Sequence, residues 1–236
     1  SEMCIRDSKR SVTLNIKTPE GRTVLERLVG SADVVMHNLR GDHAEKHRLT
    51  YAHLGKIKAQ IVCGHLSAYG RDNARASWPG YDYLMQAEAG FLSLTGEPGG
   101  PPARFGLSVI DYMTGLMLAY AVTAGVIKAR STGMGCDVDI SLYDAAVHQL
   151  SYLATWYLNQ GHVTKNAARS AHPSITPSQL VKTKDGWIFL MCQTQKFWQA
   201  LADALEAPQI TADPRFGTLS GRLEHRTELT QLLDDV

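Results

Sequence analysis

One acidic residue stands where the surrounding sequence can make a carboxylate reactive. Asp111 follows a glycine-containing loop, Arg104-Phe105-Gly106, and lies at the start of an apolar helical pattern. An Asp at a helix start commonly accepts hydrogen bonds from backbone N–H groups as an N-cap. The same position also keeps a carboxylate ionised at the edge of an apolar pocket, where it can act as nucleophile or base. From spacing alone, both interpretations stay open.

Other patterns that often mark cofactor sites are incomplete. His43 and His47 are spaced as zinc ligands on one helix face would be, but Ala44 stands where the metalloprotease motif needs Glu. Gly133-x-Gly135 lacks the third glycine of the dinucleotide-binding fingerprint and follows a helical pattern rather than a strand. No G-x-x-x-x-G-K-[ST] motif occurs. We therefore expect no metal site, no NAD site and no P-loop.

The composition is that of an ordinary globular protein. The chain has 236 residues, 44% of them hydrophobic, and its formal charge of +1 argues against a nucleic-acid partner, which calls for a basic excess. Four scattered cysteines form no C-x-x-C pair, so we expect reduced thiols and a cytoplasmic protein. The apolar stretch 107–127 contains Asp111, and its charge-free part is shorter than the ~20 residues that a bilayer needs. We predict a buried helix there and no membrane partner.

The elements that must position these residues alternate between strands and helices. Strand patterns are expected at residues 11–16, 32–36, 60–66 and 138–142. Helical patterns are expected from Thr18-Pro19 to Gly30, and at residues 42–58, 83–94, 112–129 and 143–161. Such alternation is typical of a parallel sheet with helices on both faces. We therefore predict an α/β fold with a Rossmann-like large domain.

A proline-containing stretch, residues 172–177, predicts a domain boundary. We expect a large α/β domain at 9–142, a helical linker at 143–171, and a smaller α+β domain at 172–236 with a β-hairpin at 180–192. Residues 1–8 differ in composition from the orderly pattern that begins at Lys9, and the other end stops in a helical pattern without a stop signal. We expect a piece of a longer protein, inactive and poorly stable alone.

Several stretches resemble the family III coenzyme A transferases, the CaiB/BaiF-like group that includes formyl-CoA transferase. The resemblance covers residues 9–236 in the same order along the chain. Its main motifs are Lys17-Thr18-Pro19-Glu20-Gly21, Pro79-Gly80-Tyr81-Asp82, Gly106-Leu107-Ser108-Val109-Ile110-Asp111, Val138-Asp139-Ile140-Ser141-Leu142 and Asp213-Pro214-Arg215-Phe216. The resemblance implies the family fold, in which intact members form an interlocked homodimer.

The resemblance also implies an activity. Coenzyme A would pass from an acyl-CoA donor to a carboxylic acid acceptor through an aspartyl-CoA thioester on Asp111, with coenzyme A as the cofactor and no metal. Tyr81, Asp82 and Arg104 are expected to face the substrate. The implied coenzyme A contacts are Leu14, Lys17, Asn38, Leu39, Lys46 and Leu142.

Departures from the family pattern leave alternatives. Lys46 replaces a common Arg, which keeps the charge but loses the bidentate fork, and Asn38-Leu39-Arg40-Gly41-Asp42 replaces the usual Asn-Phe-Arg-Pro-Gly. In the α-methylacyl-CoA racemase branch a His stands at the position of Tyr81, and a Tyr with its ordinary pKa near 10 is a poor base at neutral pH. Transfer is therefore favoured over racemisation. A non-catalytic CoA-binding module, in which Asp111 only caps its helix, is the alternative from another class.

Overall fold

The computed structural model describes residues 9–236, so the expectation about residues 1–8 lies outside the described part. By their contacts the residues group into two compact units. The first contains the described residues up to Met85 together with Leu107–Gln149, and the second contains Gln86–Gly106 and Leu150–Val236. The division at 142 and 171 expected from the sequence stays a prediction.

A three-stranded parallel sheet forms the centre of the first unit. Its strands are β1 (Val34–His37), β2 (Val62–Ser67) and β3 (Cys136–Ser141), in the order β1-β2-β3. The register pairs Val34 with Val62 and Val62 with Cys136. The α/β class with a parallel sheet is therefore confirmed.

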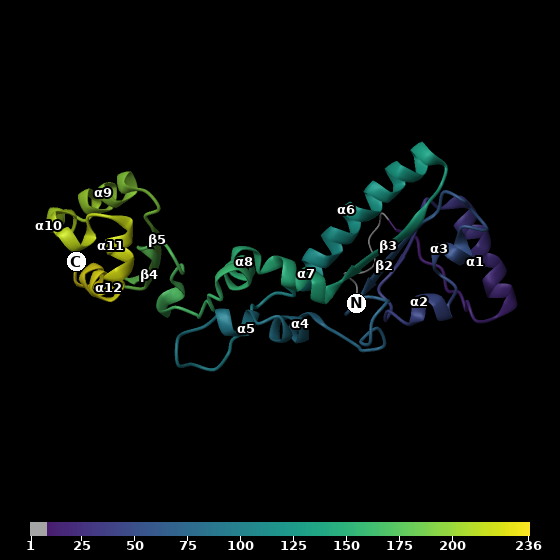
Figure 1. Cartoon of the computed structure of the whole chain (residues 1–236), viewed down its shortest axis with the longest axis horizontal. Helices are drawn as coiled ribbons and strands as arrows, with labels where there is room; N and C mark the ends of the chain where they lie inside the picture. The colour runs from purple at the N-terminus through teal and green to yellow at the C-terminus, as the bar shows by residue number, and fades with distance from the viewer. Residues whose placement is uncertain (1–8) are drawn as a thin grey trace. The chain divides into compact units, whose positions relative to one another are not determined.

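Helices cover both faces of this sheet (Figure 1). The helices of the first unit are α1 (Pro19–Ser31), α2 (His43–Lys46), α3 (Tyr51–Leu54), α4 (Asp82–Glu88, which continues into the second unit), α6 (Val109–Thr132) and α7 (Leu142–Gln149). On one face Leu118 and Val122 of α6 pack against Val62. On the other face Val29 of α1 and Leu54 of α3 pack with the strands.

Two glycines let α6 lie close to the sheet. A Cβ atom on Gly64 of β2 would stand 2.9 Å from Cγ2 of Val122, and one on Gly125 of α6 would stand 3.0 Å from Cγ1 of Val62. By length and composition α6 would also suit a membrane span. One of its faces, however, is part of the core over the sheet.

Several expected elements are wrong or shorter than their patterns. The expected strand at residues 11–16 does not form, because an alternating pattern needs a neighbouring strand to pair with, and none lies beside this segment in the described chain. The helix expected at 42–58 is two short helices, since Arg48 has a left-handed φ of 55°. Gly90 (φ 89°) and Ser151 (φ 50°) break the helical patterns expected at 83–94 and 143–161 in the same way, whereas the pattern at 112–129 is continuous within α6.

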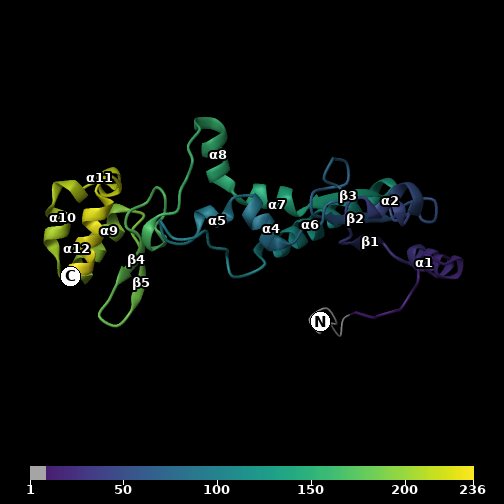
Figure 2. The same ribbon diagram turned by 90° about the horizontal axis from the view of Figure 1, so that it is seen from below.

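The second unit combines a β-hairpin with short helices around one apolar core (Figure 2). The antiparallel hairpin joins β4 (Ser178–Lys182) to β5 (Trp187–Met191), as the sequence predicts. Trp198, Phe216 and Leu229 are fully buried in the core. The helices of this unit are α5 (Phe91–Leu94), α8 (Ser151–Gln160), η2 (Ala168–Ser170), α9 (Gln195–Ala204), α10 (Pro208–Ala212), η3 (Pro214–Phe216), α11 (Leu219–Glu224) and α12 (Arg226–Asp235).

Candidate active site

A cavity of about 550 Å³ lies at the carboxyl ends of the three parallel strands. Ligands of open α/β sheets bind in this crevice because loops and helix starts converge there. Residues that follow each strand line it, together with the first turn of α6. The lining consists of Asn38, Leu39, Arg40, Leu66, Ser67, Ala68, Trp78, Pro79, Gly80, Tyr81, Asp111 and Leu142.

Asp111 is the third residue of α6, and it does not cap the helix. The cap comes from Asp82, whose Oδ2 accepts hydrogen bonds from the backbone N–H groups of Ile110 (2.7 Å) and Asp111 (3.1 Å). Ser108 occupies the N-cap position but makes no side-chain cap bond. Within the described chain, the structure records no hydrogen bond to the Asp111 carboxylate, which leaves it available to a ligand in the cavity.

The surroundings of Asp111 raise its pKa above the ordinary value. Burial is the larger cause, and the negative charge of Asp82 is the second. Both favour the neutral form because a charged carboxylate is less well solvated there and is repelled by its neighbour. A more basic carboxylate is also a stronger nucleophile once it is ionised.

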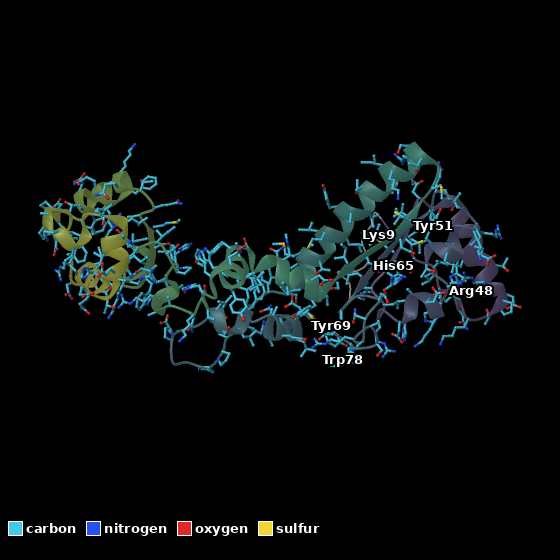
Figure 3. All side chains as sticks on the ribbon, viewed as in Figure 1. Lys9, Arg48, Tyr51, His65, Tyr69 and Trp78 are labelled. Carbon is cyan, nitrogen blue, oxygen red and sulfur yellow. The ribbon has the colours of Figure 1, made fainter. Side chains whose placement is uncertain are left out.

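Part of the cavity lining is aromatic and apolar. Trp78 is half exposed, and its ring lies 6.0 Å from that of Tyr69 (Figure 3). The Arg75 guanidinium stacks on both rings, at 5.0 Å from Trp78 and 5.4 Å from Tyr69. Leu142 is buried at the start of α7. Such a wall suits an acyl chain or a similar flexible apolar group.

A second cavity of about 500 Å³ lies at the N-terminal end of α1 and is strongly basic. Lys17, Arg22, Lys46 and Arg48 all line it. Arg22 donates hydrogen bonds to the backbone oxygens of His47 (2.8 Å) and Arg48 (3.0 Å), which fixes the rim of the cavity. Cationic side chains beside a helix N-terminus attract phosphate groups, so this cavity can hold a polyanion.

The structure distributes the predicted site residues over several places. Asn38, Leu39, Tyr81 and Leu142 line the first cavity with Asp111, whereas Lys17 and Lys46 meet in the second. Three predicted residues line neither cavity: the buried Asp82, the half-buried Leu14, and Arg104, which belongs to the second unit and donates to the backbone oxygens of Phe105 and Gly106.

Sequence reasoning missed Trp78 and Arg48. Both had a local signal, since Trp78 directly precedes the Pro79-Gly80 motif and Arg48 lies two residues after Lys46. In the described residues, no group of three or more metal-ligating side chains is arranged to hold a metal ion.

Comparisons with known proteins show which proteins this chain resembles. The family model for CoA-transferase family III matches residues 3–236. A succinate–glutarate CoA-transferase of Agrobacterium fabrum is 33% identical over 95% of this chain and 56% of its own length. An acyl-CoA transferase of Fusarium pseudograminearum is 35% identical over 98% of this chain and 51% of its own length.

A solved structure supports the same relationship. The crystal structure of a CaiB/BaiF family protein from Brucella suis superposes with a TM-score of 0.80 and 33% identity, over 96% of this chain and 60% of that one. The chain thus spans about half the length of the curated relatives it matches.

Proposed function

The chain belongs to CoA-transferase family III, and on this premise we propose that the whole protein transfers coenzyme A from an acyl-CoA donor to a carboxylic acid. The observation that carries the proposal is the position of Asp111. Its carboxylate faces an apolar-walled cavity, while Asp82 supplies the helix cap in its place. A carboxylate that only caps a helix would not be left available in this way.

In the first half of the proposed reaction, Asp111 is the nucleophile. A carboxylate oxygen attacks the thioester carbonyl carbon of the donor, and the C–S bond breaks. This gives a mixed anhydride on Asp111 and a free CoA thiolate. The thiolate then attacks the Asp111 carbonyl carbon, which releases the donor acid as a carboxylate and leaves an aspartyl-CoA thioester.

The second half runs these steps in reverse order with the acceptor. The acceptor carboxylate attacks the aspartyl thioester carbonyl, which expels CoA thiolate and forms a second mixed anhydride. The thiolate then attacks the acceptor's carbonyl carbon, giving the new acyl-CoA and the original Asp111 carboxylate. Each intermediate stays activated, so the cycle needs no external energy source.

We place the phosphates of coenzyme A in the second, basic cavity and its thioester end in the first. Lys17, Lys46 and Arg48 supply positive charge at the N-terminal end of α1. Leu39 and Leu142 offer apolar surface beside Asp111. Both cavities belong to the first unit. Coenzyme A, as acyl-CoA, is then the cofactor and no step needs a metal.

For the acceptor we propose a small dicarboxylic acid. The Agrobacterium relative is named for succinate and glutarate, which are both dicarboxylates. Arg40 lines the cavity of Asp111 and brings a positive charge there, although its guanidinium also engages Asp42 and His43. A second carboxylate of the substrate can compete for this cation.

The homodimer and the cytoplasmic location also stay proposals. One side of α6 carries large apolar side chains that are more than 60% exposed, including Tyr112, Leu116 and Tyr120. A partner subunit covering this side would bury them favourably. Analytical ultracentrifugation of the whole protein tests the dimer directly.

Trapping of the covalent intermediate tests the proposed reaction. The whole protein, mixed with succinyl-CoA, is expected to gain the mass of coenzyme A minus one water, located on the peptide that contains Asp111. Asp111→Asn should abolish both the adduct and turnover, and the matched change Asp203→Asn, on the exposed surface of α9, should alter neither. An unlabelled Asp111 in a protein that still turns over would contradict the proposal.

A further inference from the structure

A chain of three polar side chains crosses the sheet on the face opposite α6. It joins His37 of β1, His65 of β2 and Asp137 of β3. His37 Nε2 lies 2.8 Å from His65 Nδ1, and His65 Nε2 lies 2.7 Å from Asp137 Oδ1. At the other end, the backbone N–H of Leu39 donates to His37 Nδ1 at 3.2 Å. The chain therefore runs from a carboxylate on β3 to the backbone just after β1.

The two ends of this chain determine where every proton lies. The backbone N–H of Leu39 can only donate, so His37 Nδ1 must be an acceptor and the ring proton of neutral His37 must be on Nε2. That proton is donated to His65 Nδ1, which leaves the His65 proton on Nε2. Nε2 then donates to the Asp137 carboxylate, which can only accept. One pair of tautomers satisfies all three hydrogen bonds.

The carboxylate end of the chain is held firmly. Asp137 Oδ1 also accepts from the backbone N–H of Tyr51 at 2.8 Å, and Arg71 approaches Oδ2 at 3.7 Å (Tyr51 and His65 are labelled in Figure 3). Burial raises the pKa of Asp137, but the hydrogen bonds from His65 and Tyr51 and the charge of Arg71 outweigh this and lower it overall. His65 is only 1% exposed, so water cannot readily replace its partners.

The Leu39 end of the chain lies on the wall of the first cavity. Leu39 and its neighbours Asn38 and Arg40 all line the cavity that contains Asp111. We propose that His37 and His65 are positioning residues, which transmit the fixed orientation of the Asp137 carboxylate to the backbone of residues 38–40 and so shape the coenzyme A site. The proposed role in coenzyme A binding rests on the proposed function, whereas the hydrogen-bonded chain stands on the geometry alone.

The environment of His37 favours the neutral ring that this chain requires. The pKa of His37 is lowered to about 4, mainly by burial and also by the charges of His65, Arg71 and His47, against the opposing charge of Asp139. A protonated His37 would carry a proton on Nδ1 and could not accept from Leu39. The positioning should therefore persist across the neutral pH range.

NMR of the histidine rings tests the hydrogen-bonded chain of His37, His65 and Asp137 without any ligand. Long-range 15N–1H correlation spectra of the unaltered protein should show the Nε2–H tautomer for both His37 and His65. A Nδ1–H tautomer at either residue would overturn the proposal.

Variants test whether the chain positions residues 38–40. His65→Leu removes the central link and should speed hydrogen exchange of the Leu39 amide by about three- to tenfold, the usual range for one lost hydrogen bond. His65→Gln keeps one acceptor and one donor and should restore most of the protection. Cys63→Ala, a buried change on the same strand and face, is the matched control for lost packing and should leave Leu39 unchanged. Equal effects of His65→Leu and Cys63→Ala would overturn the proposal.

Coenzyme A affinity completes the test. Calorimetry should show His65→Leu weakening binding by about three- to tenfold, with His65→Gln close to the unaltered protein. If the unaltered protein binds no coenzyme A, the proposed function fails. The histidine tautomers and the hydrogen exchange of the Leu39 amide then still test whether the hydrogen-bonded chain of His37, His65 and Asp137 exists. If coenzyme A binds equally well to His65→Leu, the positioning role is excluded and the proposed function survives.

Discussion

Asp82 holds the first turn of the helix that presents Asp111, although 28 residues separate Asp82 from Ile110 in the chain. One carboxylate oxygen of Asp82 accepts from both Ile110 N and Asp111 N. The same group therefore fixes the helix start and places a negative charge beside Asp111, where it contributes to the raised pKa. One buried residue therefore caps the helix and adds to the raised pKa of the candidate nucleophile.

Substitution of Asp82 should separate these two effects. Asp82→Asn keeps an acceptor for the cap but removes the charge, so the pKa of Asp111 should fall. Because Asp111 must be ionised to attack, the acid limb of the activity profile should move to lower pH, as rates measured across pH would show. Asp82→Ala should in addition cost about 0.5–2 kcal/mol of unfolding free energy through the lost cap. Ser108→Ala is the control, since this side chain makes no cap bond, and a loss as large as that of Asp82→Ala would contradict the assignment.

The close approach of α6 to the sheet predicts opposite effects of two glycine changes. Gly64→Ala would bring a Cβ to 2.9 Å from Val122 and should destabilise the fold by about 1–3 kcal/mol. Gly115 lies in α6, and a Cβ there would meet open space. Gly115→Ala should therefore stabilise the fold by roughly 0.5–1 kcal/mol. Urea unfolding of the two variants measures both values, and a neutral Gly64→Ala would show that the helix is not tightly packed on β2.

The lowered pKa of His37 predicts a pH-dependent stability. Between pH 6.5, the ordinary pKa of His, and about 4, the unfolded chain binds a proton at His37 that the folded chain does not. The free energy of unfolding should therefore fall as pH drops through this window, by at most roughly 3 kcal/mol and by less where solvent screens the ring. Urea unfolding at pH 7 and pH 4.5 should show a smaller fall for His37→Gln. If the free energy of unfolding fell by the same amount in the unaltered protein and in His37→Gln, the prediction would be wrong.

The basic cavity predicts a selective loss of phosphate recognition. Lys17→Ala should weaken coenzyme A binding and reduce its dependence on salt concentration, because one cation near the phosphates is removed. Lys56→Ala, an exposed lysine that does not line the cavity, is the matched control. Calorimetric titrations at two ionic strengths provide the measurement, and indistinguishable salt dependences for both variants would place the phosphates elsewhere.

The sequence predicts much of the sheet and the position of Asp111 because both depend on local patterns. The apolar runs that become β1 and β2 are short and continuous, as buried parallel strands require. The segment 11–16 has the right alternation, but strand formation depends on a partner strand that the pattern cannot reveal. Likewise, the helix breaks at Arg48 and Ser151 each come from one residue with a positive φ, and neither residue is a Gly or Pro that would predict a break.

The contacts between distant residues could not be predicted in this way. Asp82 and the start of α6 are 28 positions apart in the sequence and meet only in the folded protein. His37, His65 and Asp137 meet because the parallel register places β1, β2 and β3 side by side, and register is a property of the folded sheet. Motif reasoning names residues one by one, whereas their shared hydrogen bonds arise from three-dimensional packing.

The half-exposed indole of Trp78 on the cavity wall provides an intrinsic optical reporter. The chain has four tryptophans, and the other three, Trp156, Trp187 and Trp198, belong to the second unit. Replacing those three with phenylalanine would leave Trp78 as the single tryptophan, on the wall of the cavity that Asp111 also lines and stacked against Arg75, and excitation at 295 nm would select it over the tyrosines. Its emission wavelength and its quenching by iodide would then follow occupancy of the cavity in real time, without a label and without turnover.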